Sequence, residues 1–96
     1  MKIDKLQEGE CLILTLDGWL DTQSSPILEE ALNSVPEGTQ EMVIDMKSCE
    51  YIASSGVRLL VAAHKKMDGH LTVRNVCPEI MDILNMTGVS KRIKIE

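Results

Sequence analysis

Short apolar runs that alternate with helical patterns are the feature of this sequence that most restricts its fold. The runs at residues 11–16, 41–46 and 71–73 are too short to be independent helices, and each is followed by apolar residues at helical spacing. Strands that alternate with helices in one chain are typical of an α/β fold with a mostly parallel sheet and right-handed crossovers. We therefore predict an α/β fold built from βα repeats.

The two ends of the chain predict the edges of the sheet. Residues 1–6 alternate Ile3 and Leu6 with charged residues and precede a short turn, which favours an antiparallel edge strand. Residues 92–95 also alternate and predict an exposed edge strand. We expect a mixed, mostly parallel sheet of four to five strands. Because three helices cannot cover both faces well, we expect them mainly on one face, with the other face partly solvated.

Three segments carry helix signals. In the first, Ser25 is the expected N-cap, Pro26 fits the first helical position, and Ile27 begins an apolar stripe that reaches Val35. The second helix is expected from Ser55 onward and the third from residue 78 to residue 88. The methionines at apolar positions are expected to fill the core; these are Met42, Met46, Met67, Met81 and Met86.

Size and charge restrict the class of protein. Ninety-six residues are enough for one domain and too few for two, so we expect a single domain over residues 1–96. With 10 Lys and Arg against 15 Asp and Glu, and no basic cluster beside aromatic residues, the chain is not expected to bind nucleic acid directly. Its apolar runs are far shorter than the ~20 residues that span a bilayer, which predicts no membrane insertion and a cytoplasmic location.

Motifs for metal binding and catalysis are missing from the sequence. Cys11, Cys49 and Cys77 are odd in number and lack C-x-x-C spacing, so we interpret them as free thiols and predict no metal site. The sequence has neither a Gly-rich phosphate loop nor a G-x-S-x-G nucleophile elbow. We therefore expect no cofactor, and we predict a binding protein rather than an enzyme.

The segments that follow the strands are the expected functional surface. Successive parallel strands end at the same edge of a sheet, so residues 17–25, 47–55 and 74–78 are expected to gather there. The second segment contains Ser54 and Ser55 at the start of a helix. One of them as an N-cap is the simpler interpretation. The alternative is a phosphorylated serine, because a helix N-terminus favours negative charge and Arg58 lies one turn further on.

Two residues in the first of these segments have competing interpretations. Asp21 is either an ordinary turn residue that binds nearby amides or a part of a partner surface. Trp19 is either an exposed anchor, since Trp is enriched in interface hot spots, or a plug at the end of the core.

Three stretches carry a family resemblance: "LDGWLDTQSSPILEEAL", "MVIDMKSCEYIASSGVRLLVAAHKKM" and "CPEIMDILNMTGVSKRIKI". Their order and spacing resemble the STAS domain of bacterial anti-anti-sigma factors over essentially the whole chain. The matching parts are the Gly-x-Leu-Asp turn at residues 18–21, the strand end at Ile44 and Asp45, the Ser-Ser-Gly helix start, and Thr87-Gly88.

This resemblance implies a partner switch controlled by phosphorylation. By the resemblance, Ser54 is the residue that a partner serine kinase of GHKL type phosphorylates, with Ser55 as the alternative, and that kinase is itself the anti-sigma factor. The unphosphorylated domain would bind the kinase and free a sigma factor, and a phosphatase of PP2C type would reset the switch. Ala53 departs from the family pattern, because an Asp commonly precedes the serine pair.

The resemblance also implies a partner-binding surface and a rival function. The surface would contain Asp21, Thr22, Ser24, Cys49, Tyr51, Ala53, Ser55, Gly56 and Arg58. STAS domains also serve as docking subunits of ABC lipid-transport complexes or form part of anion transporters, so a docking subunit is the rival interpretation. A nucleotide-binding regulator is a third and weaker one.

Overall fold

The computed structural model describes residues 1–96 and contains one five-stranded sheet. The elements in chain order are β1 (Lys2–Glu8), β2 (Cys11–Leu20), α1 (Ser25–Asn33), β3 (Glu41–Ile52), α2 (Ser54–Lys66), β4 (Leu71–Arg74), α3 (Pro78–Met86), the 3-10 helix η1 (Val89–Lys91) and β5 (Lys94–Ile95). The strands follow the order β1-β2-β3-β4-β5. Only β1 is antiparallel to its neighbour. The predicted α/β fold with a mixed, mostly parallel sheet is therefore confirmed.

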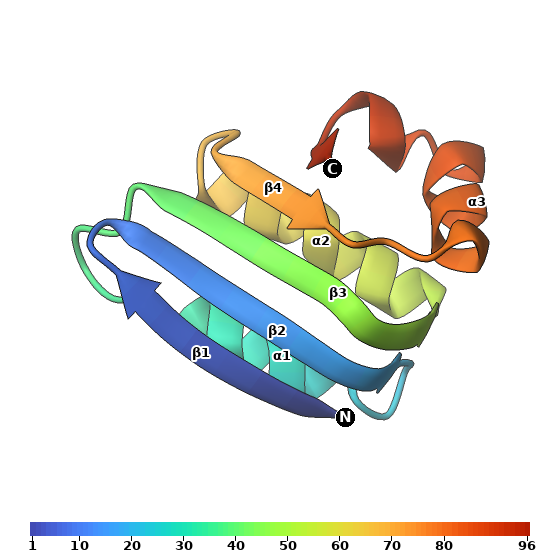
Figure 1. Ribbon diagram of the computed structural model, residues 1–96, viewed down its shortest axis with the longest axis horizontal. Helices are drawn as coiled ribbons and strands as arrows, with labels where there is room; N and C mark the ends of the chain where they lie inside the picture. Colours follow the sequence, from blue (N-terminus) through green and yellow to red (C-terminus); the bar gives the residue numbers. More distant parts are fainter.

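One face of the sheet carries the hydrophobic core. In β2, Leu12, Leu14 and Leu16 are buried while the side chains between them are only half-buried. This period of two places the buried leucines on the face that α1 and α2 cover (Figure 1). The third helix, α3, packs beside β3 beyond the end of β4. The opposite face carries no helix, as the sequence predicts.

The two central strands are longer than predicted. β2 continues to Leu20 and β3 to Ile52, where the sequence predicts ends at residues 16 and 46. Their pairing continues through two register shifts, one after Thr15 and one between Gly18 and Trp19. An irregular register breaks the alternation of buried and exposed residues, which is why the sequence pattern ended early. The Ile44-Asp45 pair is consequently in the middle of β3 rather than at its end.

The helices begin and end close to the predicted residues, with some corrections. Ser24, not Ser25, is the N-cap of α1, and its side chain makes no capping hydrogen bond. The helix ends at Asn33, and Ile27 is 43% exposed rather than part of the buried stripe. Met86 is 86% exposed, so the prediction that it fills the core is wrong. Gly88 ends α3 in the left-handed conformation (φ 78°) that favours glycine.

The C-terminal edge of the sheet is shorter than predicted. Only Lys94 and Ile95 form β5, because Val89 to Lys91 make a 3-10 turn and Arg92 still has helical backbone angles. Ile93 is buried in the core and fixes this segment against the rest of the molecule. None of the helices has the length and hydrophobicity needed to cross a membrane.

Candidate functional site

The ends of β2 and β3 bring two of the predicted segments together. Leu20 pairs with Ile52 in the parallel ladder, and the amide of Ala53 donates a hydrogen bond of 2.8 Å to the carbonyl of Leu20. The turn at residues 21–24 therefore lies beside the start of α2. The third segment differs from the prediction, because β4 pairs only with the first half of β3, up to Asp45 and Arg74. Residues 75–77 then run on toward α3 without strand pairing (Figure 1).

Neither serine of the Ser54-Ser55 pair caps α2. The N-cap is Ala53, with extended backbone angles (φ −96°, ψ 171°), and no side chain makes a capping hydrogen bond there. Ser54 and Ser55 are the first two helical residues. The simpler interpretation, in which one of them serves as the cap, is therefore wrong. A methyl group at the N-cap leaves the first-turn amides without a side-chain acceptor.

The two serines have different surroundings. Ser54 is exposed, whereas Ser55 is half-buried and its hydroxyl lies 2.9 Å from that of Ser25. Ser25 donates its only hydroxyl proton to the carbonyl of Asp21 at 2.7 Å, so Ser55 must be the donor in the contact between the two hydroxyls. Ser55 thus ties the start of α2 to the start of α1, while the Ser54 side chain faces solvent.

Asp21 and Ser24 hold the turn between β2 and α1. The amide of Ser24 donates to Asp21 Oδ1 at 2.9 Å, and the amide of Asp21 donates to Ser24 Oγ at 2.9 Å. The Ser24 hydroxyl also lies 2.6 Å from the carbonyl of Trp19. Hydrogen bonds from the Ser24 amide, and then from its hydroxyl, lower the pKa of the Asp21 carboxyl. Asp21 therefore acts as a turn residue whose carboxylate the turn stabilises. Its carbonyl accepts a hydrogen bond from Ser25, and Ser25 contacts Ser55, which directly follows Ser54.

Three residues of the expected partner surface are buried. Ser24 is 7% exposed and Cys49 is 2% exposed, so neither presents a side chain to a partner. Gly56 is also buried; a Cβ there would lie 2.7 Å from Cγ of Leu20 and 2.9 Å from Cγ1 of Ile52. The structure corrects these three assignments. Ser24 and Gly56 support the surface from the interior, and burial raises the pKa of the Cys49 thiol.

The other residues expected on this surface remain accessible. Thr22, Ser54 and Arg58 are exposed, while Asp21, Ala53 and Ser55 are half-buried. They come from the turn before α1 and the first turns of α2. These residues, together with Tyr51 and Trp19, are called the strand-end surface below.

The strand-end surface contains an exposed aromatic pair, Trp19 and Tyr51. The sequence carries no signal that these two side chains contact each other. Trp19 is 57% exposed and Tyr51 is 45% exposed, and their ring centroids are 5.8 Å apart with the planes tilted by 52°. They face each other because Trp19 pairs with Tyr51 across β2 and β3, after the register shift that no sequence signal indicates. Trp19 is therefore not a plug of the core.

Asp45 is a buried carboxylate that joins β3 to the segment after β4. It is 4% exposed and accepts hydrogen bonds from Asn75 Nδ2 at 3.1 Å, the Lys47 amide at 3.0 Å and Arg74 Nε at 3.3 Å. Burial raises the pKa of this carboxyl, but the three donors and the Arg74 charge outweigh burial and lower it overall. Asp45 has a structural role on the helix-free face, away from Ser54.

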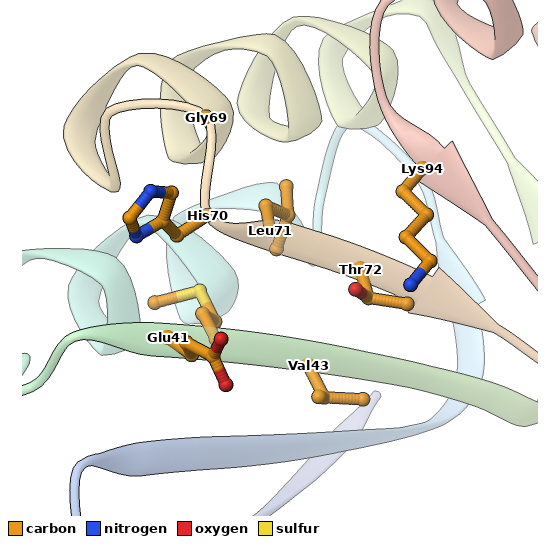
Figure 2. A pocket seen from close by; sticks show the side chains of 8 residues that line it. Glu41, Val43, Gly69, His70, Leu71, Thr72 and Lys94 are labelled. Carbon is orange, nitrogen blue, oxygen red and sulfur yellow. The ribbon is translucent and has the colours of Figure 1, made fainter.

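The hollow on the helix-free face lies far from the strand-end surface. It has a volume of about 300 Å³ between β3, β4 and β5, and its lining includes Glu41, Val43, His70, Thr72 and Lys94 (Figure 2). The lining comes from the beginnings of β3 and β4, from the turn before β4 and from β5, whereas Ser54 follows the end of β3. The hollow is therefore not a part of the site. No group of three or more His, Cys, Asp or Glu side chains is placed to hold a metal ion, and all three cysteines are free thiols.

Comparison with known proteins identifies the family and the fold. The sequence model of the STAS domain matches residues 2–96. The chain is 26% identical over 98 residues to the anti-sigma-B factor antagonist of Bacillus subtilis (strain 168), covering 99% of this chain and 90% of that protein. The fold is similar to an anti-sigma factor antagonist from Mycobacterium paratuberculosis (TM-score 0.89, 22% identity, 98% of this chain and 83% of the other).

The fold is also found in a protein of a different functional class. A sulfate transporter family protein from Wolinella succinogenes matches with a TM-score of 0.77 and 17% identity, over 94% of this chain and 80% of the other. Identity at this level shows a shared fold. The match of the family model over residues 2–96, on a sheet and helices of the expected order, establishes the family. This chain belongs to the STAS domain family.

Proposed function

We propose that this chain is an anti-sigma factor antagonist whose binding to an anti-sigma factor is controlled by phosphorylation of Ser54. The observation that carries the proposal is the contrast between the two serines: Ser54 is exposed at the first position of α2, while Ser55 is tied to Ser25. The similarity to the B. subtilis anti-sigma-B factor antagonist supports the class of partner.

The physical basis of the switch is the charge of the phosphate. A phosphoserine carries −1.5 to −2 charge at neutral pH and three strong acceptor oxygens. At the first helical position it lies close to the free amides of the first turn, so the helix tolerates it. On a partner-binding surface, the same group opposes contact through repulsion and desolvation cost. Phosphorylation would then release the partner without unfolding the domain.

A binding measurement tests the proposal. Ser54→Asp is expected to weaken binding to the cognate anti-sigma kinase by about tenfold or more, while Ser54→Ala retains binding and cannot be phosphorylated. Ser34→Asp is the matched control, because Ser34 is an exposed serine at the C-terminal end of α1, whereas Ser54 lies near the N-terminal end of that helix. Isothermal titration calorimetry gives the three affinities. Equal affinity of Ser54→Asp and the unmodified chain contradicts the proposed switch.

The modified residue is identified separately. Intact-protein mass spectrometry with fragmentation, on the chain purified from its own cells before and after treatment with a PP2C-type phosphatase, is expected to find a removable phosphate on Ser54. A phosphate on Ser55 instead would mean that the Ser25 contact opens before modification. Absence of phosphate under every growth condition counts against the switch.

A docking subunit of a transport complex is the second candidate. The shared fold of the Wolinella sulfate transporter family protein favours it, because that fold serves in a transport protein. Capture experiments with the tagged chain separate the two candidates. A GHKL-type serine kinase among the bound proteins supports the anti-sigma antagonist, and an ABC ATPase supports the docking subunit.

A further inference from the structure

A groove lies between α2 and the C-terminal segment, one helical turn from Ser54. It consists of two adjoining hollows of about 500 Å³ and about 320 Å³ that share Val61 and Arg92. The residues that define this α2–η1 groove are Val57, Arg58, Val61, Thr87, Val89 and Arg92, and the second hollow adds His64 and Lys65. Thr87, Gly88 and Val89 line the side of the groove that lies across from α2, and Gly88 has a left-handed backbone conformation (φ 78°).

The charges of the groove are all basic. Arg58, Lys65 and Arg92 are exposed at its rim, and no Asp or Glu lines either hollow. The two ion pairs of the molecule, Arg74 with Asp45 and Lys94 with Glu96, do not involve any of these three cations. In a chain with a net charge of −5, a surface with unpaired cations and no carboxylate is a local reversal of the overall charge. Such a surface attracts a negatively charged partner.

The floor of the groove is apolar. Val57 is 7% exposed and Val89 is 4% exposed, and Val61, which also lines the groove, is half-buried. An apolar floor with a charged rim has the anatomy of a protein interface, in which a desolvated centre is surrounded by polar contacts. Free phosphate or a nucleic-acid backbone would use the cations but leave this floor uncovered. The floor therefore favours a protein segment that has both acidic and aliphatic side chains.

We infer that the α2–η1 groove is the docking site for an acidic, amphipathic segment of the partner protein. This inference rests on the proposed function, since it names the part of the partner that the domain recognises. Acidic side chains of the segment pair with Arg58 and Arg92, and its aliphatic side chains cover Val57, Val61 and Val89. Helix-in-groove recognition of this kind places anchor residues at helical spacing.

The position of Ser54 links the groove to phosphorylation. Ser54 and Arg58 are four positions apart on α2, so their side chains lie on the same face of the helix. A phosphate on Ser54 would lie within reach of Arg58 and pair with it, which removes one rim cation from the partner. The same phosphate would repel the acidic segment. Both effects lower affinity, and both act through the groove.

A peptide titration tests the groove directly. The probe is a synthetic amphipathic peptide with Glu and Leu at helical spacing, added to the ¹⁵N-labelled full chain and followed by NMR. Shifts are expected at Arg58, Val61, Thr87 and Arg92, and the same peptide with Lys in place of Glu is expected not to bind. Arg92→Glu is expected to weaken binding about tenfold, because it removes an attractive rim charge and adds a repulsive one. Lys2→Glu, with the same change of charge on the exposed β1 strand, is the matched control.

The outcomes separate the groove from its alternatives. Equal weakening by Arg92→Glu and Lys2→Glu, or shifts confined to other surfaces, overturns the inference, since binding would then reflect net charge. Binding of phosphatidylglycerol vesicles but not of the peptide also overturns it in favour of a lipid surface. Light scattering tests for a dimer of the free chain. A dimer mass that Arg92→Glu abolishes would assign the groove to a second copy of this chain, which also overturns the inference. Thermal melts of the two variants check that each is folded.

Binding to the anti-sigma kinase distinguishes this inference from the proposed function. If Ser54→Asp weakens kinase binding and Arg92→Glu does not, the switch stands and the groove is not the docking site. If neither the unmodified chain nor any variant binds the kinase while the peptide still binds the groove, the proposed function fails and the groove is a docking site for an acidic segment of a different protein. In the supporting case, Arg58→Ala reduces the effect of Ser54→Asp in a double-mutant cycle, because part of that effect acts through Arg58.

Discussion

Gly56 is the residue at which the site and the core meet. A Cβ there would lie under 3.0 Å from the side chains of both Leu20 and Ile52. Gly56→Ala is expected to lower the free energy of unfolding by about 1 to 2 kcal/mol, since overpacking outweighs the gain in helix propensity. Urea denaturation measures the loss. In a Leu20→Ala background, which removes the overlap with Leu20 but leaves the one with Ile52, the loss should become smaller without vanishing; an unchanged loss contradicts this account.

At the scale of elements, α2 begins without a cap. The extended backbone of Ala53 suits an N-cap residue, but its methyl group accepts no hydrogen bond. Ala53→Asp is expected to raise the free energy of unfolding by about 1 kcal/mol, because the carboxylate accepts from a first-turn amide and interacts favourably with the helix dipole. The midpoint of urea denaturation measures the change. Ala62→Asp, at an exposed position in the middle of α2, serves as the control and should not stabilise the chain. A midpoint that moves equally in both variants excludes capping as the cause.

At the scale of the whole molecule, acid is expected to weaken the fold through Asp45. Its pKa is lowered in the folded protein, so the folded state binds fewer protons than the unfolded chain in mildly acidic solution. The stability that results is fully present above the unfolded pKa near 4 and is lost as pH falls through the folded pKa. Asp45→Asn is expected to cost about 1 to 3 kcal/mol at pH 7 and to reduce the loss between pH 5 and pH 3. Urea denaturation at these pH values measures the cost at pH 7 and the loss of stability in acid, and Asp4→Asn, at an exposed position, is the control. If Asp45→Asn loses as much stability between pH 5 and pH 3 as the unmodified chain, Asp45 is not the cause of the acid sensitivity.

Local signals accounted for the order of elements and for much of their length. The apolar runs predicted where β2, β3 and β4 begin, and Pro78 and Gly88 marked the limits of α3 to within two residues. The signals failed where pairing between strands overrides local pattern. β3 continues past Met46 because β2 pairs with Ser48, Cys49, Tyr51 and Ile52, through shifts in register that a single strand does not reveal.

Local periodicity, turn residues and short motifs were sufficient to predict the α/β class, the strand and helix order, the mostly parallel sheet and the family. Packing of the folded chain, in contrast, determines which serine is accessible, that Trp19 and Tyr51 form an exposed pair, that Cys49 and Gly56 are buried, and that Arg58 and Arg92 line one groove. Residues 30 or more positions apart make the Ser25–Ser55 contact, the aromatic pair, the contact of Gly56 with Leu20 and the shared groove. Such contacts form only when the sheet registers and the helices pack against it, so local sequence signals carry little information about them.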